Sequence, residues 1–498
     1  MFNRRFPISF QPKQVLLVVP SVLAVMMATG CAYLPQSKEQ SVPSTAVEAR
    51  VELSGQGLDR QAYSANWWQV FHDPVLEQLE QLAVNQNLEL GQSAAAIEMA
   101  AARYGIVRAE EQPQLEFRTD YRREAISQNS PLALLGAPST PFNNWQTGLG
   151  ASWELDLWGY LAHQNDAAKA NWQASQYTAA GVTISVQAQV ANTYLQLRQV
   201  YADLVVARAQ IDNAEQQVVL VQSQQHFGEA SSADVASAEV LVHQARSRLP
   251  ALQQHQLELE NQLNFLLGKG PGEHQLSIDS SNAELLPVPA TLAVGVASDV
   301  LARRPDILVA DAKLRAAIAT TAAAEADFYP RISIHGELGT EAFSLSDLGS
   351  WDSRTFAFGP SFHLPIFSGG RLTQTLELTQ AGQKQAALAY QQTVLNAWRE
   401  VSNTLNNYQH QQSRFAHIEQ AFSKQQQVRQ AVENASQHGS ASKLDVLRAE
   451  ARVLEHQAVL NRAITDSAIS VVSLYRALGG GWQAPLLASS EQSEQVAL

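Results

Sequence analysis

The fold of this chain is decided by a short stretch that occurs twice. Residues 228–239 read GEASSADVASAE, and residues 439–450 read GSASKLDVLRAE. In both places a long proline-free run ends at a Gly, and a second helical run begins behind a Ser. Glycine ends a helix because it can adopt the left-handed conformation, and serine begins one by capping free backbone N–H groups. Each stretch is therefore predicted to be the tip of a helical hairpin, and the chain to be a tandem duplication.

The helices that lead into the two tips are predicted to be unusually long. Residues 160–227 and 371–437 contain no proline. At a rise of 1.5 Å per residue, each would form a helix of about 100 Å, which no globular domain of this size can hold. Shorter return helices are predicted over 232–268 and 443–478. Pro250 lies inside the first of these, and we expect a kink or local break there.

Ahead of each long helix, the sequence changes to a period of two. The first strand shows it clearly, because Leu115, Phe117 and Tyr121 alternate with polar or charged residues. The alternation predicts two strand pairs: 114–124 with 144–156, and 331–341 with 354–364. Each run has the length of a tilted transmembrane β-strand. A half-buried hairpin of a soluble sheet is the alternative for any single pair.

A further helix precedes each strand pair. Asp73-Pro74 is a helix start, with Asp as the N-cap, and this helix is predicted to reach about Glu110. The corresponding helix is predicted from Ser298 to about Phe328. The order helix, strand pair, long helix, tip and return helix thus occurs twice. The first repeat is placed at 66–270 and the second at 298–481, with a linker at 271–297 and a C-terminal tail at 482–498.

Four strands per chain are too few to close a transmembrane barrel. An open sheet edge in lipid leaves backbone groups unpaired, at a cost of several kcal/mol each. Identical subunits are the simplest source of further strands, and three copies would supply twelve. The predicted fold is therefore an α+β membrane protein. Its tandem-repeat protomer would give a trimeric 12-stranded transmembrane β-barrel, and the long helices would continue the wall of this tube away from the membrane.

The N-terminus has the features of an export signal. Arg4, Arg5 and Lys13 precede the apolar run 15–27, and residues 1–30 are predicted to be a signal peptide. The segment ends in Ala28-Thr29-Gly30-Cys31, which resembles the bacterial lipobox. That resemblance implies lipidation of Cys31, with diacylglycerol and an N-acyl chain, and a lipidated tether over 31–65. An ordinary signal peptide with an incidental cysteine is the alternative.

Charge and composition exclude several classes of function. The formal net charge is −13, and it becomes −16 without residues 1–30, which hold three basic residues and no acid. A nucleic-acid partner is therefore not expected, since phosphate binding needs a basic face. The single cysteine excludes disulfides within the chain. We find no phosphate loop, no zinc-spaced His pair and no nucleophile elbow. The chain is predicted not to be an enzyme and to hold no metal or other cofactor.

An ordered set of short motifs resembles one family of outer-membrane proteins. The motifs are Asn66-Trp67-Trp68, Asp73-Pro74, Trp153-Glu154-Leu155-Asp156-Leu157-Trp158-Gly159, Arg303-Arg304-Pro305-Asp306, Tyr329-Pro330, Pro365-Ile366-Phe367 and the two tips. Together they resemble the TolC/OprM family of efflux channels, in its lipoprotein (NodT-like) branch. The resemblance implies a lipid-anchored homotrimer in the cell outer membrane, with a 12-stranded transmembrane β-barrel continued by a long periplasmic α-helical barrel. Its tips would dock on a periplasmic adaptor of an inner-membrane pump.

The function implied is that of a passive conduit in a tripartite efflux system. Drugs, toxic compounds or metals would pass through it from the periplasm to the exterior. A conduit for type I protein secretion is one alternative. A non-conducting periplasmic coiled-coil lipoprotein is another.

The resemblance also implies a gate at the tips. Acidic residues ring the periplasmic aperture in that family, and Asp234 and Asp445 fall at matching positions. A second acidic position, one turn past Asp445, is filled by Arg448, which could pair with Asp445 or with a neighbouring subunit. Favourable charge at a helix N-terminus is the alternative role of the two aspartates. Our hypothesis is that the gate opens when the hairpins separate and these contacts are lost.

Overall fold

The computed structural model describes residues 58–59, 64–137, 139–273, 285–286, 291–295, 303–480 and 482. The predicted signal peptide, Cys31, most of the tether and the C-terminal tail beyond residue 482 lie outside these residues. The predicted start of the second-repeat helix at Ser298 also lies outside them.

Two helices, rather than one, precede the first strand pair. They follow a short 3-10 helix, and the elements are η2 (Trp67–Phe71), α2 (Pro74–Gln86) and α3 (Leu88–Ala109). As expected, Asp73 caps α2, and its Oδ1 accepts from the backbone N–H groups of Val75 and Leu76 at 2.8 Å. The expectation of one helix from Pro74 to about Glu110 is wrong. Asn87 has extended backbone and starts a new helix, because its side-chain oxygen caps α3.

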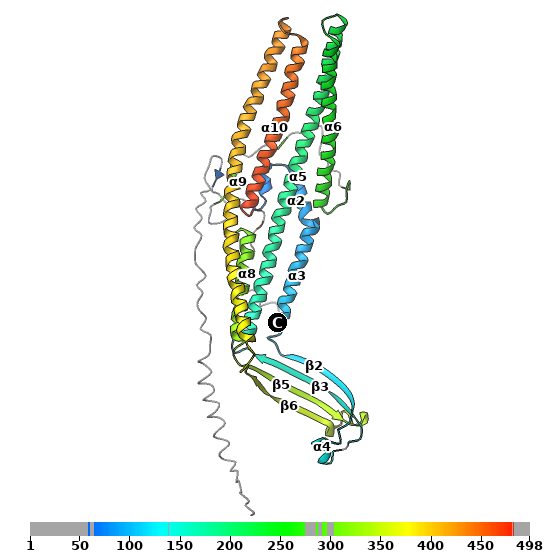
Figure 1. Ribbon diagram of the computed structural model, residues 1–498, viewed down its shortest axis with the longest axis vertical. Helices are drawn as coiled ribbons and strands as arrows, with labels where there is room; N and C mark the ends of the chain where they lie inside the picture. The colour runs from blue at the N-terminus through cyan, green and yellow to red at the C-terminus, as the bar shows by residue number, and fades with distance from the viewer. Residues whose placement is uncertain are drawn as a thin grey trace, which may run out of the picture. The chain divides into compact units, whose positions relative to one another are not determined.

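The four predicted strands form one antiparallel sheet. They are β2 (Gln114–Glu124), β3 (Phe142–Leu155), β5 (Arg331–Ala342) and β6 (Arg354–His363), in the spatial order β2-β3-β5-β6. The strands of the two repeats therefore meet at the β3–β5 pair, where Leu149 lies opposite Leu338. Both outer strands, β2 and β6, have one edge with no partner strand in the described part of the chain. Figure 1 shows the four strands side by side.

The loops at the ends of the strand pairs carry only short elements. The loop from β2 to β3 holds α4 (Pro131–Leu134), and the loop from β5 to β6 holds η3 (Leu345–Asp347) and η4 (Trp351–Ser353). A separate two-residue parallel pair joins β1 (Leu58–Asp59) to β4 (Leu292–Ala293).

Long helical hairpins follow the strands in both repeats. Their helices, with the shorter α8 that precedes β5, are α5 (Tyr160–His226), α6 (Ser232–Leu266), α8 (Pro305–Ala326), α9 (Arg371–Gln437) and α10 (Lys443–Ala477). Helix α10 packs against both α9 and α5, and α6 packs against α5, so the spatial order is α9-α10-α5-α6 (Figure 1). Helix α6 continues through Pro250, so the expected local break is absent.

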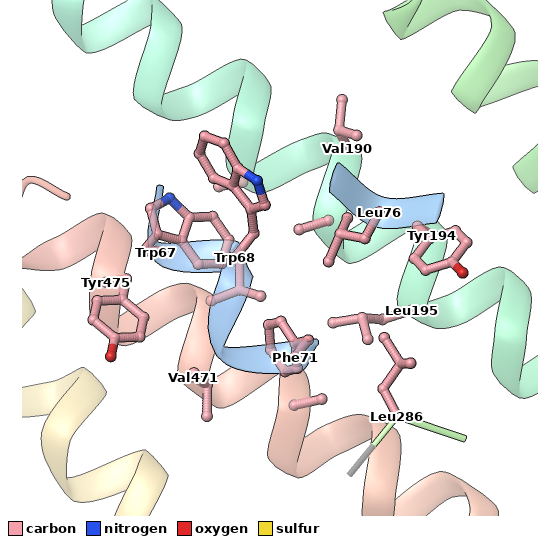
Figure 2. Close-up of a cluster of buried hydrophobic side chains, with 14 of the residues drawn as sticks. Trp67, Trp68, Phe71, Leu76, Val190, Tyr194, Leu195, Leu286, Val471 and Tyr475 are labelled. Atoms are coloured by element: carbon pink, nitrogen blue, oxygen red, sulfur yellow. The ribbon is translucent and has the colours of Figure 1, made fainter. Parts of the chain in front are cut away.

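The largest core lies where η2 and α2 meet the two hairpins. Trp67, Trp68 and Phe71 are buried there, together with Tyr194 of α5 and Tyr475 of α10 (Figure 2). The Trp67 and Tyr475 rings stack with their centroids 5.8 Å apart. The tryptophan pair is thus a packing element that attaches the segment before α2 to both repeats.

No helix in the described ranges combines the length and the apolar character needed to cross a membrane.

Candidate functional site

The two faces of the sheet differ sharply in chemistry. Because side chains alternate along a strand, the register places Glu116, Arg118, Asp120 and Glu337 on one face. This polar face borders a hollow of about 870 Å³ that also receives Arg122, His335 and Glu341. Charged and amide groups on this face can line a passage for water.

The opposite face of the sheet is apolar. One row of side chains crosses all four strands on this face. In it Phe117 pairs with Leu149, Leu149 with Leu338, and Leu338 with Phe356. These side chains are between 44% and 79% exposed in the single chain. An apolar surface of this extent needs an apolar environment, because exposed apolar patches on soluble monomers are normally small.

The tip of the first hairpin is closed by a capping box. Gly228 has a φ of 79°, which ends α5, and Ser231 caps α6. The Asp234 carboxylate accepts from the Ser231 backbone N–H at 2.8 Å and from its hydroxyl at 2.7 Å. Hydrogen bonds from the Ser231 side chain and backbone therefore lower the pKa of Asp234. The residue is exposed and ionised, and it orders the turn.

The second tip repeats this geometry with different flanking residues. Gly439 has a φ of 77°, and Ser442 caps α10. The Asp445 carboxylate accepts from the Ser442 backbone N–H at 3.0 Å and from its hydroxyl at 2.7 Å. These bonds lower the pKa of Asp445, and the positive charge of Arg448 adds a smaller contribution.

Arg448 does not form the pair with Asp445 that its spacing allowed. Within the described chain no ion pair joins them, since the carboxylate is occupied by Ser442. Arg448 is exposed on α10. The structure therefore brings Asp234, Asp445 and Arg448 to two matching tips, where both aspartates serve as caps. The Ser-x-x-Asp spacing was the signal for this role.

A second repeated feature was not predicted from the sequence: each return helix ends against the residue that precedes α3 or α8. In the first repeat, the Asn87 side chain donates at 2.8 Å to the carbonyl of Leu266, the last residue of α6. Gly268 follows with a φ of 68°, and a Cβ there would lie 2.3 Å from the Gln86 carbonyl oxygen. We call this contact the neutral junction.

The second repeat forms the same contact with charged groups. Arg304 caps no N–H, but its guanidinium donates to the carbonyl of Ala477, the last residue of α10. It also contacts Asp306 and Glu400, both at 2.7 Å, and Glu400 accepts from Arg476 at 3.4 Å. We call this contact the charged junction.

The buried guanidinium of Arg304 stays protonated. Burial alone would lower the pKa of Arg304, but hydrogen bonds and charge from Asp306 and Glu400 outweigh it and raise that pKa. Gly479 closes the junction, and a Cβ there would lie 3.2 Å from the Arg304 Cα atom. The motif Arg303-Arg304-Pro305-Asp306 was one of those that carried the family resemblance, but only the tertiary contact reveals its partners on α9 and α10.

One buried acid in α2 has no partner. The Glu80 side chain is fully buried, and neither carboxylate oxygen has a hydrogen-bond partner in the described structure. Burial raises the pKa of Glu80 well above its ordinary value. The side chain is therefore a neutral carboxylic acid over a wider pH range than an exposed glutamate.

The described residues contain no cluster of three or more His, Cys, Asp or Glu side chains that could hold a metal ion. The histidines of the long helices are dispersed, as at His243, His255 and His417, and these three are exposed.

Comparison with known proteins identifies close structural and sequence relatives. The family described as "Outer membrane efflux protein" matches residues 79–269 and 296–480. The cation efflux system protein CusC of Escherichia coli O6:H1 is 29% identical over 470 residues, which cover 94% of this chain and 99% of CusC. The probable outer membrane lipoprotein SilC of Salmonella typhimurium is 27% identical over 468 residues, covering 93% and 98% of the two chains.

A solved structure has the same fold. The outer-membrane channel OprN superposes with a TM-score of 0.78 at 27% sequence identity, covering 86% of this chain and 95% of that chain. A similarity that covers 86% of the chain concerns the fold rather than one motif.

Proposed function

Because the chain belongs to the outer membrane efflux protein family, it is the outer-membrane channel component of an efflux system, and we propose that three copies form one conduit. Membership confirms the expected family, the efflux function and the location in the outer membrane. The family consists of channel proteins, and we propose that this chain likewise has no catalytic activity.

The observation that carries the trimer proposal is the open four-stranded sheet. Its edge strands β2 and β6 belong to different repeats, so β2 of one copy can pair with β6 of the next. The outermost hairpin helices α6 and α9 also belong to different repeats. The same rotation between copies would therefore extend the strands and the helices around one axis, as a closed cyclic assembly requires.

The chemistry of the two faces indicates which face of the sheet would point outward in a closed barrel. With the apolar face outward, three copies would present Phe117, Leu149 and their neighbours to lipid. The polar face would then line the lumen. The opposite closure would place charged side chains in the hydrocarbon, where a single charge costs about 2–4 kcal/mol at the midplane.

We propose that the conduit works with a periplasmic adaptor and an inner-membrane pump. The tips at 227–231 and 438–442 would be the ends that face the adaptor. Small molecules or metal ions are the proposed cargo, and the pump rather than the channel would select among them. Co-purification with the products of neighbouring genes tests this: recovery of an exporter ATPase of protein secretion instead of an efflux pump would overturn the efflux cargo.

The lipid anchor is proposed at Cys31. The similarity to SilC, named as a probable lipoprotein, supports it. Intact-mass measurement of the mature protein should show an N-terminal Cys31 carrying a diacylglycerol and an N-acyl chain. A Cys31→Ser variant should lack the added mass, and an unmodified wild-type Cys31 would contradict the proposal.

The gate is proposed at the tips, with Asp234, Asp445 and Arg448 among the contacts that are lost on opening. The capping role of both aspartates means that their removal loosens the turn as well as removing a charge. Arg448 is the cleaner probe because it is exposed and caps nothing. If the Asp445→Ala, Arg448→Ala double variant leaves single-channel conductance and antibiotic exclusion unchanged, these residues are not the gate.

Bilayer recording tests the conduit itself. The purified full-length protein should migrate as a trimer in mild detergent and should conduct in planar bilayers. A monomer that does not conduct would overturn the proposal. Cysteine pairs placed between β2 and β6 should cross-link neighbouring copies, because those strands are too far apart in one sheet to cross-link within a chain.

A further inference from the structure

The apolar face of the sheet carries charge in only two places. Within its four strands, the residues that alternate onto this face include no acid, and the only cations are Arg123 and Arg354. Both lie at the strand ends next to the loops 125–141 and 343–353, away from the ends that lead to the helices. Every other charged strand residue alternates onto the polar face.

Arg354 stands beside a pocket on this apolar face. The pocket has a volume of about 540 Å³, and its floor is formed by Phe117, Leu149 and Leu338. The loop from β5 to β6 supplies its rim through Gly349, Ser350 and Trp351. The Trp351 ring is 77% exposed, so a large aromatic surface faces the same space.

The guanidinium of Arg354 pairs with an aromatic ring and a carbonyl rather than with any carboxylate of the described residues. It lies over the Trp351 ring, 4.3 Å from the centroid, and donates to the Trp351 carbonyl. Among the described residues no acid lies within 4.0 Å of it. Stacking fixes one face of the planar group and leaves further N–H donors, which match the oxygen atoms of a phosphate.

We propose that this pocket binds a lipid with an anionic phosphate head group, with Arg354 on the phosphate and an acyl chain along Phe117, Leu149 and Leu338. The proposal rests on the function above, which places the apolar face in the outer membrane and the helical tips toward the periplasm. The loops 125–141 and 343–353 lie at the strand ends away from the helices, and they would therefore be at the outer surface of the membrane. An apolar floor with a cation at the membrane boundary fits an amphiphile, since a soluble anion would gain nothing from the floor. Trp351 would lie at the head-group level, where aromatic side chains are enriched.

The sheet offers a matched control. Arg122 lies one residue from Arg123, on the polar face, and contributes to the hollow on that side. Arg122→Gln therefore removes the same charge from the same sheet without touching the apolar face. Arg354→Lys keeps the charge but loses the planar fork.

The experiment measures lipid retained by full-length protein in detergent micelles doped with phosphatidylglycerol, by phosphorus assay after gel filtration. Phosphatidylcholine micelles and inorganic phosphate are the other arms. Wild type and Arg122→Gln should retain phosphatidylglycerol alike and in preference to phosphatidylcholine. Arg354→Gln should bind it about tenfold more weakly, the loss expected for one charge-assisted hydrogen-bonding group. Arg354→Lys should fall between.

Several results would overturn the proposal. These are equal retention by Arg354→Gln and wild type, no preference for phosphatidylglycerol, or displacement of the lipid by millimolar inorganic phosphate. Trp351→Ala is the second variant if Arg354→Gln does not assemble, and it should also reduce retention. Trimer migration and conductance are recorded for every sample. Wild type that conducts but retains no lipid refutes the lipid site alone, whereas wild type that fails to conduct refutes the conduit.

Discussion

The neutral and charged junctions have the same geometry and opposite chemistry. Both place an extended N-cap residue, Asn87 or Arg304, against the last carbonyl of a 35-residue return helix, and both close with a left-handed glycine. In the first repeat an uncharged amide makes the contact. In the second, a buried guanidinium forms ion pairs with Asp306 and Glu400, and Glu400 also pairs with Arg476.

The difference shows which part of the junction is required. A helix end leaves carbonyl groups without partners, and a buried end must have them satisfied. Any donor of suitable reach can do so, and the two repeats use different ones. The backbone path, by contrast, is shared, and in both repeats it holds a glycine with positive φ whose Cβ would crowd the opposing residue. We therefore expect the glycines to matter most and the polar partners to differ in how they respond to salt.

The largest effect is expected from Gly268→Ala. A left-handed non-glycine residue costs about 1–2 kcal/mol, and the new Cβ would overlap the Gln86 carbonyl, which adds about 1–3 kcal/mol of strain. Gly479→Ala should cost less, because its nearest atoms are 3.2 Å away. Gly228→Ala and Gly439→Ala are the controls, since they have positive φ but open space. Thermal unfolding by circular dichroism should rank the variants in this order, and equal losses would contradict the overlap argument.

Next in size is the loss of the polar partners. Arg304→Met should destabilise by about 2–3 kcal/mol, less than a fully buried broken pair, because the Glu400 side chain is 35% exposed. Asn87→Ala should lower the free energy of unfolding by about 1–2 kcal/mol, because it removes the N-cap of α3 and the hydrogen bond to Leu266.

Salt dependence separates the two junctions further. Raising NaCl to about 1 M should reduce the difference in free energy of unfolding between wild type and Arg304→Met, because ionic strength screens partly exposed ion pairs. The difference in free energy of unfolding between wild type and Asn87→Ala should not change with salt. A salt-independent Arg304→Met effect would show that the charged junction acts through packing alone.

A smaller, pH-dependent effect is expected at Glu80 of α2. Its pKa is raised in the folded state, so the folded protein holds a proton that the unfolded chain releases once the pH passes the ordinary glutamate value. Glu80 therefore lowers stability progressively as pH rises above about 4.3. Glu80→Gln should be more stable than wild type at pH 8, with the difference shrinking toward pH 5. A constant difference across this range would refute a raised pKa of Glu80 in the folded state.

The smallest effect is expected at the two helical tips. Unlike the two junctions, they share the same capping box and should respond alike. Asp234→Asn and Asp445→Asn should each speed hydrogen exchange in the first turn of α6 or α10 while leaving global unfolding unchanged. Because the pKa of each aspartate is lowered in the fold, its contribution is present above the ordinary aspartate value and is lost as pH falls through the folded pKa. Unequal responses of the two tips would indicate an added role for Arg448.

The sequence alone determined the elements and their duplication. Period-two alternation marked β2, β3, β5 and β6 to within about two residues of their observed ends, and proline-free runs bounded by Gly and Ser marked α5 and α9. These signals are local, because alternation, capping and helix termination depend on neighbours along the chain. The family motifs gave the efflux function.

Only the tertiary structure decided how the elements meet. The two junctions, the fully buried Glu80 and the pairing of β3 with β5 depend on residues far apart in sequence. The pocket lined by Arg354 likewise combines residues of all four strands with a loop. Sequence pattern shows which face of each element is apolar. It does not show which carbonyl lies within reach of a given side chain, because that is set by long-range packing.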